Sequence, residues 1–520
     1  MSNFTFHLPE RYNVSEVLFH NLAAGRGDKV AIYCGEQSVP YAQLCATANR
    51  VGNALKALNI EPGARIMQLM LDTPAFPALF FGAVKAGYIP IVTNTALTAD
   101  DYAYFLQDSA APVAILDAAL YPQIASIRAQ CPDLRYVIVV GDAPPDTIDW
   151  ETWLAQASPE LDVADTHKDD PAFWMYSSGS TGRPKGIVHL HHDIPYTIAS
   201  YAQHVLAINA NDITFSVPKL FFAYGFGNNM TFPYSVGAST VLWPGRPTPD
   251  VVFDHLERYR PTLFFAVPTI YVPMLALAGA EQRDLSSLRM CISAAEALPP
   301  DVCRQWGERY GVEIVEGLGS TEVLHIYISN YAGRVKPGSS GTLVAGYAIE
   351  LRDPDGNLVP PGETGAMLVR GDSSAPYYWN RPDKTAHTMR GEWIYTGDLF
   401  KQDADGYFYF NGRADEMMKV SGQWVSPVEV ELTLSKHAAV KECAMISIHD
   451  AAGLMTSKAY IVLHEPETAS PALAKTLQDF VKQQIAPYKY PRLIVFIAEL
   501  PKTGTDKIDR LALRALEKKE

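Results

Sequence analysis

Several features that would narrow the class of protein are scarce in this chain of 520 residues. Its six cysteines are scattered, and none belongs to a Cys-x-x-Cys pair, which argues against a disulfide scaffold and favours free thiols in a reducing cytoplasm. No uninterrupted apolar run reaches the roughly 18–20 residues that a membrane-spanning helix needs. The N-terminus lacks a basic segment followed by an apolar one, so we predict no signal peptide. We therefore expect a soluble, cytoplasmic protein.

Positive charge is also in deficit. The chain has 43 Lys and Arg residues against 57 Asp and Glu, a net charge of −14, which argues against a general nucleic-acid binder. A local basic site in an acidic protein can still bind small anions. The length exceeds that of one ordinary domain and predicts two to four domains or subdomains.

Helical and strand patterns alternate along the first part of the chain. They predict helices at 40–58, 78–87, 100–108 and 120–130, and strands at 65–70, 89–93, 113–117 and 136–140. A similar rhythm returns at 213–295. Such alternation is typical of layered α/β structure with parallel strands.

The pattern changes after about residue 340. Short β-like runs separated by the turns DPDG and PPGETG favour antiparallel strands. The last hundred residues or so then read as helix 428–437, strands 442–449 and 458–464, and helix 473–485. We therefore predict an α/β protein with a large N-terminal domain, 1–414, of layered subdomains with a β-rich distal part, and a small α+β C-terminal domain, 415–520.

The segment SSGSTGRPKG, 177–186, is polar and rich in glycine, yet apolar sequence lies on both sides of it. It follows a predicted strand, AFWMY, and precedes a stretch that we expect to begin a helix. Strand, glycine-rich loop and helix together are a common way to bind phosphate, because backbone N–H groups converge there and Lys185 or Arg183 adds charge. The segment is not a Walker A loop, since Pro184 precedes Lys185 and Gly186 follows it. A solvent-exposed linker is the alternative.

A second segment, EGLGSTEVLHIY at 316–327, also follows a predicted strand. It places Ser320, Thr321 and Glu322 together, and hydroxyl and carboxylate oxygens suit Mg²⁺ beside a phosphate. The alternative is an ordinary capped helix start.

Three later segments and one histidine cluster complete the candidate motifs. Asp398 in WIYTGDLF could accept hydrogen bonds from both hydroxyls of a ribose. The segments NGRADEMMKVSG, 411–422, and LPKTGTDKIDR, 500–510, are charged and would by themselves be ordinary surface. HLHHD, 189–193, has its first two histidines two residues apart and no cysteine partner nearby, so we do not expect a zinc site.

Taken in order, SSGSTGRPKG, SAAEALP at 293–299, EGLGSTE, YTGD, GRADEMMKVSG with PVEVE, and PKTGTDKIDR resemble the motifs of the acyl-adenylate-forming superfamily. Its members include acyl- and aryl-CoA ligases, peptide-synthetase adenylation domains and luciferases. The resemblance spans nearly the whole chain. KLFFAYGFGNN, 219–229, and STEVLHIY are similar to the corresponding segments of aryl-acid ligases of the benzoate type.

The resemblance implies a role for each matching residue. Those expected to bind ATP or AMP are Ser177, Ser178, Ser180, Thr181 and Lys185 at the β- and γ-phosphates, Ala295, Glu296, Ala297, Glu316 and Gly317 at the adenine, and Asp398 and Arg413 at the ribose. Thr321 would contact the α-phosphate, Glu322 would hold Mg²⁺, and Lys507 would be the lysine required for adenylation. Asp415 matches the hinge between the domains. Lys419, Ser421 and Gly422 would serve the coenzyme A half-reaction.

Two positions depart from the family pattern. Asp506 stands immediately before Lys507, where the family usually has glycine, and the adenine loop SAAEAL has alanine where glycines are common. The intact PKT and KI on either side still support the assignment of Lys507.

The implied reaction has two steps. A carboxylate oxygen attacks the α-phosphorus of ATP, giving acyl-AMP and pyrophosphate, and the thiol of coenzyme A then displaces AMP. Two anions must be brought together in the first step, so Lys507 and Mg²⁺ would supply positive charge where negative charge accumulates. In the family the C-terminal domain presents Lys507 first and, after rotating at the hinge, a second face.

The acid is expected to be benzoate or a simple hydroxy-, amino- or fluoro-benzoate. By position, its pocket involves Phe222, Ala223, Tyr224, Gly319, Leu324, His325 and Ile326. Aromatic walls with a glycine floor suit a flat ring. His325 and Tyr224 would either bond a ring substituent or only pack. The alternatives are a CoA ligase for 4-hydroxybenzoate, aminobenzoate or a short- or medium-chain fatty acid, an adenylation domain loading a carrier protein, a luciferase-type oxygenase, and a non-catalytic nucleotide-binding regulator. We expect a monomer or a homodimer.

Overall fold

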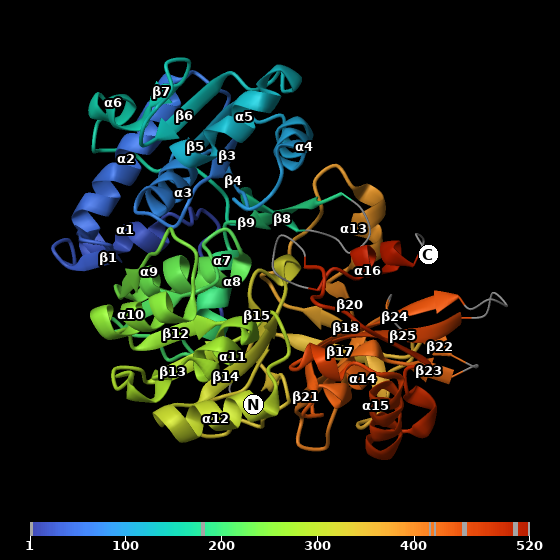
Figure 1. Cartoon of the computed structure of the whole chain (residues 1–520). Helices are drawn as coiled ribbons and strands as arrows, with labels where there is room; N and C mark the ends of the chain where they lie inside the picture. The colour runs from blue at the N-terminus through green and yellow to red at the C-terminus, as the bar shows by residue number, and fades with distance from the viewer. Residues whose placement is uncertain are drawn as a thin grey trace. The chain divides into compact units, whose positions relative to one another are not determined.

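The computed structural model describes residues 4–177, 183–414, 416, 418–420, 423–449, 455–502 and 508–517 (Figure 1). The chain divides into two compact units. The first holds Met1–Ile349 and Val369–Tyr395, and the second holds Glu350–Leu368 and Thr396–Glu520. These units place the β-rich part after residue 349 largely with the C-terminal part, because its strands pair mainly with one another. The predicted boundary between residues 414 and 415 concerns a different property, namely where the C-terminal domain rotates. It stays a prediction.

A seven-stranded sheet in the first unit follows the predicted helix–strand alternation. Its strands are, in spatial order, β7 (Ile148–Asp149), β6 (Tyr136–Val140), β5 (Val113–Asp117), β3 (Arg65–Leu69), β4 (Ile89–Val92), β8 (Pro171–Ser177) and β9 (Lys185–Leu190). The helices that follow the strands are α2 (Tyr41–Ala57), α3 (Ala75–Lys85), α4 (Ala99–Ser109), α5 (Tyr121–Ile127) and α6 (Trp150–Ala155). Figure 1 shows α2 and α3 to one side of β3 and β5, and α4 and α5 to the other. The helices and strands predicted over 40–140 are confirmed.

Close packing of α2 on α3 depends on two glycines. A Cβ at Gly82 would lie 2.3 Å from the carbonyl oxygen of Ala48, and one at Gly52 would lie 2.8 Å from the carbonyl oxygen of Gly82. No side chain fits at either place, so the two helices cross almost backbone to backbone.

The segment after the glycine-rich loop differs from the prediction. It forms β9, which pairs antiparallel with β8 so that Ser177 lies opposite Lys185 and Phe173 opposite His189. The predicted helix start is wrong here. Ile187 and Val188 are β-branched residues that pack in the core, and this favours a strand. The loop therefore joins two strands, and no helix N-terminus follows it directly.

A nine-stranded sheet forms the other half of the first unit. Its strands are, in spatial order, β16 (Thr342–Leu343), β15 (Ile326–Ser329), β14 (Ile314–Gly319), β13 (Met290–Ser293), β12 (Leu263–Ala266), β10 (Ile213–Ser216), β11 (Ser239–Val241), β1 (Val30–Cys34) and β2 (Gln37–Pro40). The strands from β14 to β1 are parallel, and those at the edges run antiparallel.

Other elements of this unit are α1 (Glu16–Ala23), α7 (Asp193–Thr197), α8 (Ala223–Phe226), α9 (Phe232–Val236), α10 (Pro249–Tyr259), α11 (Pro268–Ala276), α12 (Pro300–Tyr310), α13 (Pro382–Thr388) and β19 (Met389–Arg390). Helices α10, α11 and α12 contribute to one core with the parallel strands, in which Tyr271 and Trp306 meet edge to face at 4.9 Å. Burial of such large aromatic side chains is a main source of stability.

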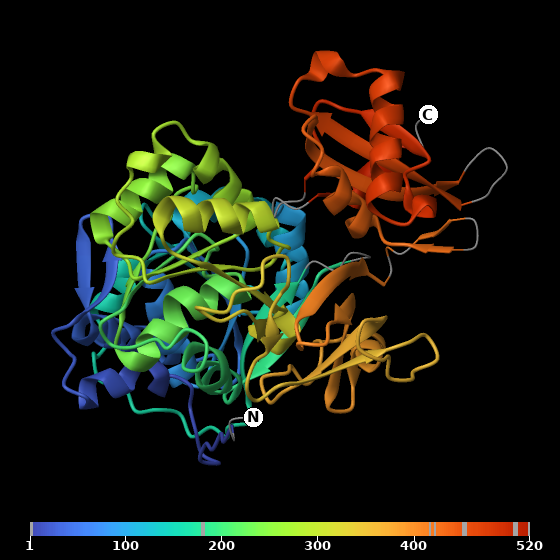
Figure 2. The ribbon, with the colours of Figure 1, turned by 90° about the horizontal axis from the view of Figure 1, so that it is seen from below.

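The second unit has the α+β order that the sequence predicts. Its elements, some of whose ends belong to the first unit, are β17 (Ala348–Arg352), β18 (Thr364–Arg370), β20 (Trp393–Gln402), β21 (Phe408–Arg413), β22 (Met418–Val420), β23 (Gln423–Val425), α14 (Pro427–Leu434), β24 (Val440–His449), β25 (Met455–Leu463), α15 (Pro471–Gln484), β26 (Leu493–Phe496) and α16 (Arg510–Leu516). Figure 2 shows helices lying across the strands of this orange-to-red part. Val430, Leu477 and Ile461 join its core.

Two sequence predictions concern the state of the cysteines and the length of the apolar segments. All six cysteines lie in the described ranges, and none is in a disulfide. Among the described residues, no helix is long and apolar enough to cross a bilayer.

Candidate functional site

The motifs of the first unit follow the carboxyl ends of its parallel strands. The glycine-rich loop follows β8, the SAAEAL loop follows β13, and the STE segment follows β14. Strands β13 and β14 are neighbours, with Ser293 opposite Glu316. Ligands of open α/β sheets bind at this end of the strands.

The turn Thr321–Val323 presents its carbonyl oxygens to the protein. The Thr321 oxygen lies 2.9 Å from Nε2 of His189, the Glu322 oxygen accepts from the N–H of Ala375 at 2.8 Å, and the Val323 oxygen accepts from the hydroxyl of Ser373 at 2.9 Å. A carbonyl oxygen carries partial negative charge and would repel a phosphate. Because all three carbonyl oxygens of the turn accept from protein donors, none of them is available to face a bound anion. The buried hydroxyl oxygen of Ser320, at the start of the turn, has no partner among the described atoms.

The carboxylate of Glu322 is connected to the loop lysine through one tyrosine. The hydroxyl of Tyr378 donates to Oε1 of Glu322 at 2.8 Å, and Nζ of Lys185 lies 4.3 Å from the centre of the Tyr378 ring. A cation over an aromatic face is attracted by the ring quadrupole. The arrangement brings together one carboxylate and one cation from two motifs that are 137 residues apart in the sequence.

The residues predicted to surround the adenine lie on β14 and on the loop after β13. Glu316 is buried, and its Oε1 accepts from the N–H of Leu298 at 3.4 Å, which joins the two segments. Burial raises the pKa of Glu316 to about 8. Ala295 and Ala297 are exposed, and Ala295 has a φ of +74°. Glycine adopts this left-handed conformation more readily than alanine does.

Five of the seven predicted acid-pocket residues contact one another. Nε2 of His325 donates to the carbonyl oxygen of Tyr224 at 3.3 Å, and their rings are 5.8 Å apart. Gly319 pairs with Ile326, and a Cβ at Gly319 would lie 2.6 Å from the carbonyl oxygen of His325. Leu324 is the centre of a tight turn closed by the bond from the N–H of His325 to the oxygen of Val323 at 2.9 Å, with a φ of +68°. Phe222 and Ala223, at the start of α8, are half-buried.

The protonation state of His325 follows from its surroundings. Burial lowers its pKa to about 3, so the ring is neutral near pH 7. Because Nε2 is the donor to Tyr224, Nδ1 carries no proton, and this atom has no hydrogen-bond partner among the described residues. A bare, buried acceptor nitrogen therefore lies among the aromatic rings of Tyr201, Tyr224 and Phe232.

The second unit brings together the two residues predicted for the ribose. Asp398 and Arg413 lie opposite each other on β20 and β21, and Nη1 of Arg413 is 3.1 Å from Oδ1 of Asp398. The segment that carries Lys507 lies outside the described residues. Its flanks, Lys502 and Ile508, form a β-bridge, and the half-buried Arg510 beyond it makes a two-pronged bond to Glu431 at 2.8 and 2.9 Å.

Several predicted site residues have no described environment. The residues outside the described ranges are Ser178, Ser180, Thr181, Asp415, Ser421, Gly422, Asp506 and Lys507. Lys419 lies on β22, where only its backbone is described, and Glu296 and Gly317 lie on the adenine segments. The roles of all these residues stay predictions.

The HLHHD histidines have protein partners. Nδ1 of His191 accepts from the N–H of Val14 at 3.1 Å, and Nδ1 of His192 donates to the oxygen of Lys168 at 3.1 Å. His189 contacts the Thr321 turn described above. The sequence does not predict this contact, nor the contacts of Tyr378 and Ser373 with the same turn. The segments HLHHD and SSAPYYW contain no local signal for a partner that is distant in the sequence.

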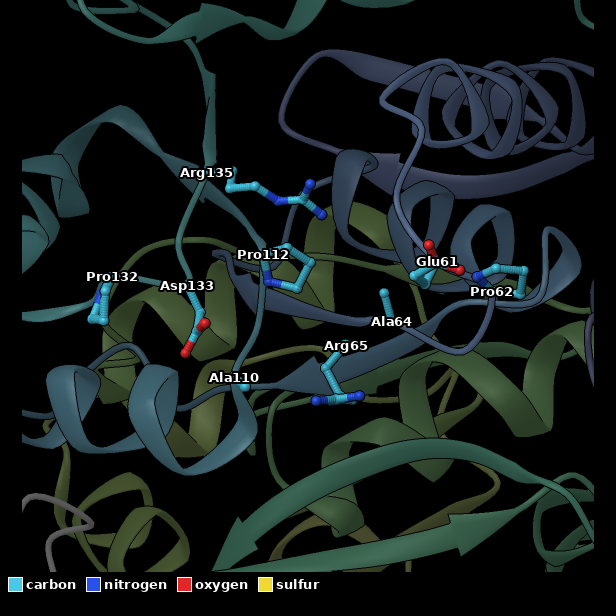
Figure 3. A pocket seen from close by; sticks show the side chains of 9 residues that line it. All are labelled: Glu61, Pro62, Ala64, Arg65, Ala110, Pro112, Pro132, Asp133 and Arg135. Carbon is cyan, nitrogen blue, oxygen red and sulfur yellow. The ribbon is translucent and has the colours of Figure 1, made fainter.

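A cavity of about 430 Å³ lies at the opposite end of the seven-stranded sheet (Figure 3). Its lining residues are Glu61, Pro62, Ala64, Arg65, Ala110, Pro112, Pro132, Asp133 and Arg135. Arg65 begins β3, while Pro112 and Arg135 immediately precede β5 and β6. The cavity is therefore at the amino ends of the strands, away from the motifs of the candidate site.

Two family models match this chain. The AMP-binding enzyme model covers residues 19–379, and the model of the AMP-binding enzyme C-terminal domain covers residues 429–507. The chain belongs to the AMP-binding enzyme family. It is a ligase that uses ATP and coenzyme A.

Individual relatives are similar over almost their whole length. A benzoate–CoA ligase of Thauera aromatica is 46% identical over 98% of this chain and 97% of its own. A 4-hydroxybenzoate–CoA/benzoate–CoA ligase of Rhodopseudomonas palustris is 44% identical over 97% of this chain and 94% of its own.

Solved structures agree with this placement. An anthranilate CoA ligase in complex with anthranoyl-AMP has a TM-score of 0.93 and 43% identity, covering 98% of each chain. A benzoate CoA ligase of Burkholderia xenovorans has a TM-score of 0.88 and 42% identity, covering 97% of this chain and 100% of its own. The fold class predicted from the sequence is confirmed.

Proposed function

We propose that this protein is an AMP-forming ligase that joins benzoate, or a simple ring-substituted benzoate, to coenzyme A. The observation that carries the proposal is the 46% identity to a benzoate–CoA ligase over 98% of this chain. The protein converts the acid and ATP into aryl-AMP and pyrophosphate, and then the aryl-AMP and coenzyme A into aryl-CoA and AMP.

Adenylation requires groups that bring two anions together. Ser177 and Lys185, with Ser178, Ser180 and Thr181 of the same loop, hold the phosphates that leave, while Thr321 contacts the α-phosphate. Lys507 supplies positive charge where the carboxylate oxygen attacks. Catalysis of this kind is mainly positioning and electrostatic stabilisation.

Glu322 is the residue proposed to hold Mg²⁺. Its half-buried carboxylate is oriented through Oε1 by Tyr378, and such oxygen donors fit a hard cation that also binds phosphate oxygens. Bound Mg²⁺ would offset negative charge on those phosphate oxygens.

The nucleoside is held by two sets of groups. Glu316 and Gly317, with the loop residues Ala295, Glu296 and Ala297, border the adenine. Asp398 accepts from the ribose hydroxyls, and Arg413, 3.1 Å from that carboxylate, keeps it oriented.

The second half-reaction uses a different arrangement of the C-terminal domain, 415–520. Asp415 is the proposed hinge residue, and Lys419, Ser421 and Gly422 serve thioester formation. Turning at one or a few loop residues is an ordinary hinge motion.

The acid is proposed to lie among Phe222, Ala223, Tyr224, Gly319, Leu324, His325 and Ile326. The aromatic surroundings of His325 favour a flat ring over an alkyl chain. A fatty acid, or an amino acid destined for a carrier protein, is the alternative. FFAYG contains no acid to bind an α-amino group, which disfavours the amino acid.

A panel of carboxylic acids tests the proposal. The purified protein is assayed for CoA-dependent AMP production with benzoate, hydroxy-, amino- and fluorobenzoates, and fatty acids of increasing length. We expect turnover with benzoates. Release of pyrophosphate with medium-chain fatty acids but not with benzoates would refute the proposed substrate class.

Assembly and location are separate proposals. A monomer or homodimer in the cytoplasm is expected of such a ligase, and light scattering of the purified protein together with cell fractionation would check both.

A further inference from the structure

The carbonyl of Thr321 is held by a buried pair of ionisable residues that the reaction scheme above does not use. Nδ1 of His189 on β9 lies 2.7 Å from Oδ2 of Asp193, the first residue of α7, and both side chains have no exposed surface. Nε2 of the same ring lies 2.9 Å from the Thr321 oxygen. The pair thus connects β9, the strand after the glycine-rich loop, to the turn Thr321–Val323 after β14.

The donors and acceptors determine where the protons are. A carbonyl oxygen can only accept, so Nε2 of His189 carries a hydrogen. Nδ1 faces a carboxylate oxygen at 2.7 Å, and two lone pairs at that distance would repel, so a proton lies between them as well. The N–H of Leu190 also donates to Oδ2 of Asp193 at 3.1 Å, which favours the carboxylate. His189 therefore has a hydrogen on each side of its ring, one on Nε2 toward Thr321 and one shared between Nδ1 and Oδ2 of Asp193.

Other groups complete the surroundings of the pair. The ring of Phe173 stacks on His189 with centroids 5.1 Å apart, which fixes the plane of the imidazole ring. Nε2 of His192 lies 3.2 Å from the second oxygen of Asp193. With neither ring nor carboxylate exposed, the bond to Thr321 is shielded from water and from competing donors.

We propose that His189 and Asp193 are positioning residues for adenylation: they fix the Thr321–Glu322 peptide so that the Thr321 hydroxyl and the Glu322 carboxylate keep their places. The inference rests on the proposed function of that turn. An error of about 1 Å in a positioned group can cost about 100-fold in rate. Thioester formation, which does not displace pyrophosphate, depends less on this turn.

Two substitutions at His189 separate its two contacts. In His189→Gln the amide nitrogen takes the place of Nε2 and can still donate to Thr321. In His189→Asn the amide takes the place of Nδ1 and can still bond Asp193, but the Thr321 oxygen loses its donor. We expect His189→Asn to lower aryl-AMP formation about 100-fold and His189→Gln to restore much of it, with thioester formation from supplied aryl-AMP nearly unchanged in both.

His191→Asn is the matched control, since His191 is a buried histidine two residues further along the chain, just after β9, that bonds Val14 and not the turn. ATP–pyrophosphate exchange measures the first step, and aryl-CoA formation measures the second. Equal loss in His189→Asn and His189→Gln, no loss in either, or equal loss of both half-reactions would overturn the proposal. A wild-type protein without exchange on any aromatic acid would instead refute the proposed function.

Asp193→Asn decides the matter if neither His189 variant folds. The asparagine amide can donate to a bare Nδ1, so the ring keeps its bond from Nε2 to Thr321 while the carboxylate of residue 193 is removed. We expect an intermediate loss confined to adenylation, together with a shift of the ¹⁵N resonance of Nδ1 of His189, which then accepts a hydrogen bond instead of sharing a proton with a carboxylate. Unchanged adenylation, or a loss shared with thioester formation, would contradict the role.

Discussion

The hydroxyl of Tyr378 donates a hydrogen bond to the carboxylate of Glu322 at 2.8 Å, and the same ring lies beneath Nζ of Lys185 at 4.3 Å. One side chain thus orients both the carboxylate proposed for Mg²⁺ and the cation proposed for the leaving phosphates. Tyr378 itself is held by its backbone, whose N–H bonds the hydroxyl of Thr385 at 3.0 Å. The contact with Glu322 uses the hydroxyl of Tyr378 and the contact with Lys185 uses its ring, so a substitution can remove the first and keep the second.

Replacing Tyr378 by Phe removes the hydrogen bond and keeps the ring under Lys185. A hydrogen bond to a charged group contributes about 1.5–3 kcal/mol, so we expect pyrophosphate release to fall at least tenfold and more Mg²⁺ to be needed for half-maximal rate. Titrating Mg²⁺ in a pyrophosphate-release assay measures both. Tyr377→Phe is the neighbouring control. An unchanged Mg²⁺ requirement in Tyr378→Phe would show that the bond does not orient Glu322.

The left-handed conformation of Ala295 predicts a stabilising substitution. An alanine at a φ of +74° has a conformational strain energy of about 1–2 kcal/mol. Glycine has no such strain, because it lacks a Cβ. Glycine loses about 0.4–1 kcal/mol through its freer unfolded chain. Ala295→Gly should therefore stabilise by up to about 1.6 kcal/mol, whereas Ala297→Gly should destabilise by about 0.4–1 kcal/mol.

Thermal unfolding of the two variants checks this difference. Both alanines are exposed and lie in one loop, and Ala297 is not among the residues of positive φ, so backbone conformation is the main difference between them. Equal midpoints for the two variants would mean that the loop relaxes around Ala295.

Division of labour between Lys507 and Lys419 is the next prediction. Lys507→Ala should reduce aryl-AMP formation about 100–1,000-fold, because one positive group is removed from the site where negative charge develops, and should largely spare thioester formation from supplied aryl-AMP. Lys419→Ala should show the reverse. Single-turnover assays of each half-reaction measure both effects, and equal loss of both steps in either variant would contradict the proposed roles.

Much of this organisation could be predicted because it depends on local pattern. Alternating apolar residues predict the parallel strands. Asp398 and Arg413, by contrast, are assigned to one site only through the resemblance to the family. The strand β9 was not predicted, since IVHL suits a buried strand or a helix equally well and only pairing with β8 decides. The contacts of His189 with Thr321 and of Tyr378 with Glu322 join residues that are far apart in sequence. Such contacts arise from tertiary packing, which one sequence does not reveal.

Glu316 predicts how stability changes with pH. Burial raises the pKa of this carboxyl group from its ordinary value of 4.5 to about 8 in the folded protein. Between these values the unfolded chain has lost a proton that the folded protein keeps, so the free energy of unfolding falls as the pH rises, by up to about 1.4 kcal/mol per pH unit. The loss begins above about pH 4.5 and is complete above about pH 8.

Glu316→Gln removes this dependence while keeping an oxygen that can accept from the N–H of Leu298. We expect the variant to match the wild type near pH 5 and to unfold at a higher temperature near pH 8, because only the wild type must then bury a charge or hold a proton against the solvent. Glu313→Gln is the control, since Glu313 is exposed and bonds the N–H of Gly333. Thermal midpoints across this pH range measure the effect, and a constant difference between Glu316→Gln and wild type would mean that Glu316 is ionised in the fold.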